Sequence, residues 1–411
     1  MRRFEGLAHG LGPLTHHHKS VPPAWWSLPA ATVLAQGPRL SAWQSPVAVL
    51  DRGALEHNSE LLTRWATERG LELAMHGKTV MAPALWRATS GAGGTLTVAT
   101  PWQAQIARHT GINSILLANT VSDPVGLRWI ANQLDADPSF ALVLNVDSME
   151  GLELLELTPG WRPFDVLVEL GAPGGRGGVR TQEAALALAT AVSRSPRARL
   201  LGVSGYEGVV GPDRSPGSVA AVKSFVADVV SALLQAQGCG LVEGPGVVSL
   251  GGSGWLDVVA DGLAGLDPAV RRIVRPGAFL LHDHGHYAAL SPFRAGASEA
   301  LRPALTVLAR VLSAPEPGCA VLDAGRRDVG EDQGRPIVLA PDGRPVAGAT
   351  VTALNDQHAI VTGLEHLQVG DVVRLGITHS CTTMDRWGLL PVVESWDEAD
   401  PVVIDLVATV F

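Results

Sequence analysis

The chain has 411 residues, which exceeds the size at which one hydrophobic core usually stops growing, so we expect a large domain and a smaller one. Hydrophobic residues make up 46% and charged residues 17%, which is typical of a compact protein with much buried surface. The net charge of -9, with no stretch that concentrates Lys and Arg, argues against a nucleic-acid groove. Three scattered cysteines and the lack of a long apolar run predict a cytoplasmic protein without a disulfide framework or a membrane span.

Residues 1–45 are rich in Gly, Pro, His and Trp and show no clear periodicity. His16, His17 and His18 are adjacent, and three adjacent histidines do not easily converge on one metal ion. We therefore interpret this part of the chain as a solvated segment.

From residue 46 onward, apolar runs of strand length alternate with helical stretches such as 54–69, 102–109, 124–134, 182–193 and 219–237. The expected strands are 47–50, 71–75, 96–99, 115–118, 141–146, 165–170, 200–204 and 247–250. This alternation predicts a parallel sheet covered on both faces, and eight such units predict a (β/α)₈ barrel over residues 46–290. An open doubly wound sheet is the alternative, but Asp51-Arg52-Gly53 is not the glycine-rich turn that it needs after its first strand.

After Arg275-Pro276-Gly277 the helical period disappears. Short β-rich runs follow at 305–312, 320–323, 337–339, 359–362, 372–375 and 402–410, separated by Gly and Pro turns. They predict a second, all-β domain over residues 291–411.

Lys78 lies just past the carboxyl end of the predicted strand 71–75, and Pro83 begins a helical stretch soon after it. In a parallel barrel that end of the strands carries the chemistry. A partly desolvated lysine with a lowered pKa can form a Schiff base with an aldehyde cofactor. An ordinary solvated lysine is the alternative, but Lys and Arg are scarce in this chain, and His76 and Thr79 flank Lys78 in an otherwise uncharged loop.

The motif His76-Gly77-Lys78-Thr79, followed by Met81-Ala82-Pro83, resembles the cofactor-lysine motif of the D-serine dehydratase and D-threonine aldolase family, especially its bacterial amino acid deaminase branch. The resemblance implies a pyridoxal 5'-phosphate enzyme of the alanine-racemase-like barrel class, with Lys78 as the cofactor lysine and His76 beside the cofactor. Met75 stands where the family usually has proline. The resemblance also implies that residues 1–45 pack with the β domain, and that a homodimer completes the site.

A phosphate site is predicted at Gly251-Gly252-Ser253-Gly254, which follows the strand 247–250 and begins a helix. Backbone N–H groups and a helix dipole can bind an anion there, and the last strands of barrels often do so. A plain tight turn explains this short glycine run equally well.

Arg176 lies in the glycine-rich loop 169–180, where the backbone can approach a ligand closely. The resemblance implies that Arg176 contacts the phenolic oxygen of the cofactor and that Tyr206, one of two tyrosines, contacts its ring. The alternatives are a surface arginine on a flexible loop and a core aromatic with a satisfied hydroxyl.

His379 and Cys381 are two residues apart, a spacing that places both side chains on one face of an extended segment. Imidazole and thiolate are both good zinc ligands, and two protein ligands leave open positions for catalysis. His-x-Cys alone often occurs by chance. The segment 378–387 resembles the metal motif of the family, with Ser380 and Met384 at positions that are usually proline and phenylalanine.

Two histidine segments are less decisive. The run at 355–358 resembles a segment that lies near the metal in the family, so His358 is a candidate catalytic residue, although a turn histidine is the simpler explanation. The run from His282 to Tyr287 is dense in potential ligands, but its place between the two domains favours an active-site edge or a subunit contact over a separate metal site.

Taken together, the resemblance implies that Zn²⁺ polarises the 3-hydroxyl of a D-amino acid such as D-serine or D-threonine while Lys78 removes the α-proton, giving a 2-oxo acid and ammonia. Breaking the Cα–Cβ bond instead would give glycine and an aldehyde. Cys381 favours the dehydratase, because the aldolase branch typically has aspartate there. A non-catalytic cofactor-binding protein would need no β domain, and a racemase would have no use for His379 and Cys381.

Overall fold

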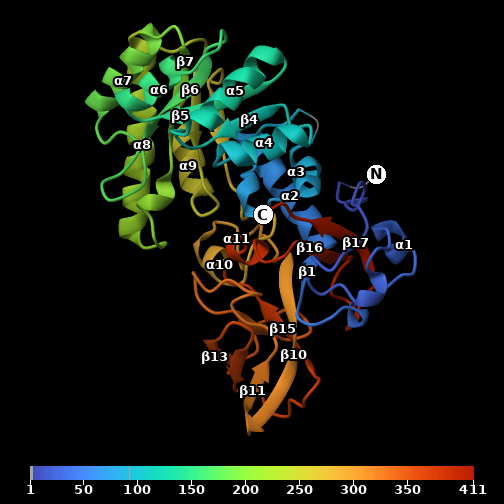
Figure 1. Cartoon of the computed structure of the whole chain (residues 1–411). Coiled ribbons are helices and arrows are strands. Elements are labelled where there is room, and N and C mark those ends of the chain that lie inside the picture. The colour runs from blue at the N-terminus through green and yellow to red at the C-terminus, as the bar shows by residue number, and fades with distance from the viewer. Residues whose placement is uncertain (1–2, 92) are drawn as a thin grey trace.

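Two sheets organise the computed structural model, which describes residues 3–91 and 93–411 (Figure 1). The first sheet has eight parallel strands in the order β2-β9-β8-β7-β6-β5-β4-β3. A parallel bridge between His76 and Thr97 joins the chain after β2 to β3, so the two ends of this order meet. The strands are β2 (Glu72–Leu73), β3 (Leu96–Val98), β4 (Ser114–Leu117), β5 (Ala141–Val146), β6 (Phe164–Leu170), β7 (Ala198–Gly205), β8 (Val247–Leu250) and β9 (Arg271–Val274).

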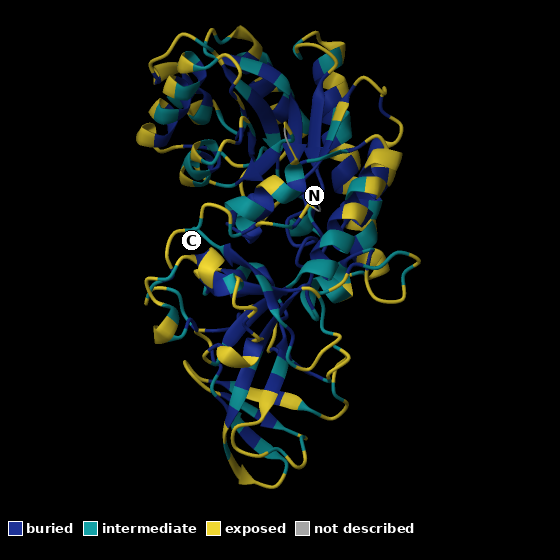
Figure 2. Ribbon diagram, turned by 90° about the vertical axis from the view of Figure 1, so that its right-hand side faces the viewer, coloured by how far each residue is buried: buried dark blue, intermediate teal, exposed yellow. Residues whose placement is uncertain are grey.

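Helices cover the outside of this sheet, and Figure 2 shows their exposed outer faces around the buried strands. They are α2 (Arg52–Glu68), α3 (Pro83–Ser90), α4 (Pro101–His109), α5 (Pro124–Ala136), α6 (Met149–Leu157), α7 (Gln182–Arg194), α8 (Pro216–Gly238) and α9 (Leu256–Leu263). Several begin with the same local signal, in which a side chain accepts a hydrogen bond from the first helical turn; Thr100, Asp123, Ser148, Thr181 and Ser215 do so. The predicted parallel α/β barrel is confirmed.

The second sheet has nine strands and forms the other lobe. Its strands are β1 (Val47–Asp51), β10 (Leu305–Glu316), β11 (Cys319–Leu322), β12 (Ile337–Leu339), β13 (Thr350–Leu354), β14 (Ala359–Thr362), β15 (Val372–Gly376), β16 (Leu389–Val393) and β17 (Val403–Ala408). All of its pairings are antiparallel except that of β1 with β16. Two short helices, α10 (His286–Leu290) and α11 (Cys381–Met384), lie where the lobes meet (Figure 1).

One predicted barrel strand was wrong. The run 47–50 forms β1, which lies in the second sheet between β10 and β16, with Val47 opposite Leu308. The eighth strand of the barrel is β9, a segment for which the sequence predicted no strand. A short buried apolar run looks the same in either sheet, because periodicity does not choose the partner strands.

The amino-terminal segment packs against the second sheet. It includes α1 (Ala30–Leu34) and the 3-10 turns η1 (Pro23–Trp25) and η2 (Leu40–Ala42). Leu14, Val33 and Trp43 share a buried apolar cluster with residues of β1, β16 and β17. The Asp405 carboxylate accepts hydrogen bonds from the backbone of Leu7 and Ala8, both at 2.8 Å.

Helix α8 is, among the described residues, the one helix that is long and apolar enough to cross a membrane by length and composition. This is weak evidence, because a core helix of a soluble protein passes the same test. Val222, Val226 and Val229 of α8 are buried within the main hydrophobic core of the protein.

Candidate active site

A cavity of about 520 Å³ lies at the carboxyl ends of the barrel strands, where the second lobe meets them. Its volume is in the range of small-molecule sites. Nine of the residues proposed from the sequence line it: His76, Lys78, Arg176, Tyr206, Gly251, Gly252, Ser253, His379 and Cys381. The structure therefore brings residues that are about three hundred positions apart in the sequence to one enclosed site within a single subunit.

Lys78 lies in a 3-10 turn, η3 (Gly77–Thr79), in the loop that follows β2. Gly77 is needed in this turn because a Cβ there would lie 2.9 Å from Nε1 of Trp86, whose ring donates a hydrogen bond to the Gly77 carbonyl. Burial lowers the pKa of the Lys78 amine, while the nearby Cys381 opposes that shift. A lysine with a lowered pKa has more of the neutral amine that nucleophilic and base chemistry require.

His76 and Arg275 are buried near Lys78. Burial, followed by the charges of Lys78 and Arg275, lowers the pKa of His76 well below its usual value, so the ring is neutral. Its Nδ1 is buried and has no partner among the described residues. Arg275, at the end of β9, donates hydrogen bonds to the carbonyls of Gly205 and Ser249.

His379 and Cys381 form the wall of the cavity that the second lobe contributes, next to the lysine loop. The Asp332 carboxylate lies 2.6 Å from Nδ1 of His379, which leaves Nε2 as the ring nitrogen available to a metal. Burial lowers the pKa of His379, but Cys381 and Asp332 outweigh burial and raise it to about 9. Burial raises the pKa of the Cys381 thiol, but His379, Thr79 and Lys78 together bring it below its usual value.

The sequence predicted that His379 and Cys381 share one face of an extended segment. Both side chains do line one cavity, but the predicted extended conformation is wrong. The segment is not extended, because Ser380 has helical backbone angles and Cys381 begins α11. A turn into a short helix brings the two side chains together. Cys381 also reaches the lysine loop, where its Sγ lies 3.4 Å from Oγ1 of Thr79.

Only part of the predicted phosphate loop is available to bind an anion. The buried Glu207 carboxylate accepts the backbone N–H groups of Gly251 and Gly252, at 3.0 and 2.7 Å. Ser253 and Gly277 also line the cavity, and their backbone N–H groups make no hydrogen bond to any described residue. They are candidates to bind an anion, whereas Gly254 does not line this cavity.

Arg176 and Tyr206 lie together on the barrel side. The Arg176 guanidinium carbon is 5.1 Å from the centre of the Tyr206 ring. The glycine-rich loop is tied back by Asp147, which accepts the Gly178 N–H at 2.7 Å, and by Arg180, which donates to the carbonyls of Gly177 and Gly178. This loop leaves the Arg176 side chain facing the cavity.

His358 does not line the cavity. It is an exposed residue in the turn between β13 and β14, where its carbonyl accepts the Asn355 N–H at 2.8 Å. The sequence resemblance gave no indication that this hairpin points away from the site within one subunit.

Three residues that contribute to the site were missed in the sequence, namely Glu207, Arg275 and Asp332, whereas His286 and Tyr287 line the cavity as the predicted active-site edge. Arg275 had a signal, because it follows an apolar run and precedes Pro-Gly. Tyr287 lies in the histidine-rich run that the sequence marked. Glu207 and Asp332 had none, since each acts through a contact with a residue distant in the sequence.

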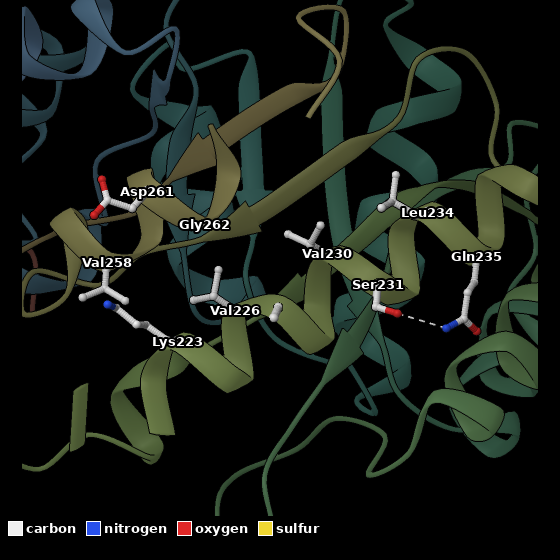
Figure 3. A pocket seen from close by; sticks show the side chains of 10 residues that line it. Lys223, Val226, Val230, Ser231, Leu234, Gln235, Val258, Asp261 and Gly262 are labelled. Carbon is white, nitrogen blue, oxygen red and sulfur yellow. Dashed lines mark hydrogen bonds between the residues drawn. The ribbon is translucent and has the colours of Figure 1, made fainter. Parts of the chain in front are cut away.

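A second hollow lies on the outer surface of the barrel between α8 and α9 (Figure 3). Val226, Val230 and Leu234 give it an apolar wall, with Lys223 and Asp261 at its edge. None of the residues proposed from the sequence lines it.

Comparisons with known proteins agree with this geometry. Residues 304–393 match the family described as Putative serine dehydratase domain, and this range includes His379 and Cys381. D-threonine aldolase from Arthrobacter sp is 28% identical over 389 residues, covering 90% of this chain and 93% of that protein. 3-Hydroxy-D-aspartate aldolase from Paracoccus denitrificans strain Pd 1222 is 26% identical over 337 residues, covering 81% of this chain and 84% of the relative.

The chain is a homologue of these D-amino acid lyases.

Solved structures show the same fold for this homologue. D-threonine aldolase from Filomicrobium marinum superposes with a TM-score of 0.74 at 23% identity, covering 90% of this chain and 96% of that one. D-threo-3-hydroxyaspartate dehydratase from Delftia sp. HT23 gives 0.72 at 23% identity, covering 89% and 97%. Alanine racemase from Corynebacterium glutamicum gives 0.56 at 21% identity, covering 80% and 89%, which confirms the alanine-racemase-like architecture.

Proposed function

We propose that this protein is a pyridoxal 5'-phosphate- and zinc-dependent lyase that converts a D-3-hydroxy amino acid, of the D-serine or D-threonine type, to a 2-oxo acid and ammonia. The observation that carries the proposal is the single cavity that Lys78 shares with His379 and Cys381. An amine with a lowered pKa and a soft metal-ligand pair in one site fit a substrate that must lose both an α-proton and a 3-hydroxyl.

The cavity suits an anionic aldehyde cofactor. Lys78, Arg176 and Arg275 bring positive charge into a protein of net charge -9. Ser253 and Gly277 offer free amides for the phosphate, and the unpartnered Nδ1 of His76 offers a polar contact. When bound there, the cofactor supplies an electron sink for the charge that develops at Cα. The Lys78 amine then serves as the base that accepts the α-proton.

The wall with His379 and Cys381 suits zinc. Among the described residues no group of three or more His, Cys, Asp and Glu could hold a metal ion, and we propose His379 and Cys381, which line this cavity, as a two-ligand site. Such a site leaves open positions for substrate and water, and a bound zinc ion would act there as a Lewis acid on the 3-hydroxyl oxygen. Asp332 holds the imidazole through Nδ1, which fixes its tautomer and orientation.

An aldolase is the second candidate, because two of the homologues named above are aldolases. Deprotonation of the 3-hydroxyl in the same site would break the Cα–Cβ bond and release glycine and an aldehyde. Cys381 favours the dehydratase, since a soft thiolate ligand suits zinc better than the harder metals. We also propose that the enzyme works as a homodimer in the cytoplasm.

The experiment is an assay of purified protein with D-serine and D-threonine, with and without a chelator, measuring keto acid and glycine separately. We expect lysine-bound cofactor absorbance and keto acid formation that stops on chelation and returns with zinc. Protein without that absorbance would contradict the cofactor assignment, and chelator-insensitive turnover would contradict the metal assignment. Glycine as the main product would select the aldolase.

A further inference from the structure

The histidine-rich run from His282 to Tyr287 has no role in the proposed function, yet it lies directly beside the metal motif. The backbone N–H of His284 donates to the Ile377 carbonyl at 2.8 Å, and that of His286 donates to Thr378 at 3.0 Å. Gly285 allows this approach, because a Cβ there would lie 2.8 Å from Cγ2 of Thr378. Helices α10 and α11 accordingly lie next to each other in Figure 1.

Asp283 fixes the start of α10. Its side chain is fully buried, and one carboxylate oxygen accepts the N–H groups of Gly285, Tyr287 and Ala288 at 3.0, 2.9 and 3.2 Å. Three hydrogen bonds from one turn to one buried carboxylate hold that turn in place. The side chains of His286 and Tyr287 consequently reach the cavity.

Tyr287 lies close to the metal pair. Its ring centre is 6.2 Å from that of His379, and its side chain lines the same cavity as Cys381 and Lys78. Tyr287 is partly buried, and its hydroxyl makes no hydrogen bond to any described residue, so it is free to bond a molecule in the cavity. A phenol keeps its proton at neutral pH and can donate a hydrogen bond.

The chain has only one other tyrosine, Tyr206, which lines the same cavity. Tyr206 packs with Arg176, whereas Tyr287 packs with His286 and His379. The two phenols therefore have different neighbours, although both also line a second, smaller hollow.

We propose that the Tyr287 hydroxyl binds the 3-hydroxyl oxygen of the substrate, donating a hydrogen bond beside the His379 and Cys381 pair. This inference rests on the proposed function and adds a substrate-binding residue to it. It assigns the histidine-rich run a purpose, since Asp283 and Gly285 hold the turn that presents the phenol. It also gives the enzyme a contact that a D-amino acid without a 3-hydroxyl does not make.

The test compares Tyr287→Phe with Tyr206→Phe, because each variant removes one oxygen atom from one of the two tyrosines. For each, kcat/KM is measured with D-serine or D-threonine, whichever the wild type converts faster. The Kd of D-alanine, which lacks the 3-hydroxyl, is measured by titration of the cofactor absorbance, and bound zinc is measured by elemental analysis.

We expect Tyr287→Phe to lower kcat/KM for the hydroxy substrate on the order of 10- to 100-fold, while zinc content and the Kd of D-alanine stay at wild-type values. Tyr206→Phe should change both substrates alike. An equal loss for D-alanine, a loss of zinc, or no change at all in Tyr287→Phe would overturn the inference. A wild-type protein without cofactor absorbance or turnover would instead refute the proposed function.

Discussion

The two walls of the cavity are built in different ways. The barrel wall takes its residues from loops that follow strands, as Lys78 follows β2, Tyr206 follows β7 and Gly251 follows β8. The other wall has His379 and Tyr287, which come from separate segments, and Asp332 contacts His379 from a third segment. We expect the proposed cofactor wall to tolerate changes in the other lobe that alter the proposed metal site and the substrate. We expect damage to the barrel wall to abolish the chemistry, and damage to the other wall to remove one function at a time.

The largest effect should come from Lys78→Ala. Loss of the amine removes both the cofactor attachment and the base, so turnover should fall by roughly 1000-fold or more, together with the lysine-bound cofactor absorbance. Lys223→Ala is a matched control, because Lys223 is an exposed lysine on α8. If Lys78→Ala kept its absorbance, the cofactor lysine would have to be another residue.

Cys381→Ala should separate the functions of the two walls. We expect loss of tightly bound zinc and a fall in turnover of at least about 100-fold, since a Lewis acid contributes several kcal/mol, while cofactor absorbance remains. The control is Cys239→Ala, which removes an exposed thiol at the end of α8. Elemental analysis and the cofactor spectrum distinguish the outcomes, and simultaneous loss of zinc and cofactor would show that the walls are not independent.

Asp332→Asn should weaken the metal site without removing a ligand. The amide no longer enforces the tautomer of His379 that leaves Nε2 free, so zinc affinity should fall on the order of 10- to 100-fold. A competition titration with a chromogenic chelator measures this affinity. Asp356→Asn, in the exposed turn between β13 and β14, should bind zinc as the wild type does. An unchanged affinity in Asp332→Asn would mean that other contacts orient the imidazole.

The smallest effect should come from His358→Ala. His358 is exposed and lies outside the cavity within one subunit, so kcat/KM should stay within about twofold of the wild type. A loss of tenfold or more would contradict this expectation. It would place this hairpin at the site of a partner subunit.

Residues of the barrel wall were found from the sequence because their signals are local. An apolar strand followed by a polar or glycine-rich loop marked Lys78 and Arg176, whereas Tyr206 was proposed from the family resemblance, and all three line the cavity. The same reasoning assigned β1 to the wrong sheet and missed β9, because the residues of a strand do not show which strands it pairs with. For the other wall, only the short His-x-Cys motif could be recognised in the sequence. Asp332 and Glu207 act across long sequence separations, and no local pattern marks such contacts.

The most direct test of the shared cavity uses protein in which cobalt replaces zinc, so that the metal and the cofactor each give an absorbance signal. Both signals are followed while one ligand, D-serine, is added under conditions that prevent turnover. The account predicts that the two spectra change together, with the same dependence on D-serine concentration and one D-serine per subunit. A change in the cofactor spectrum alone, with the cobalt spectrum unaffected at saturation, would show that the lysine and the metal pair do not act on a common substrate.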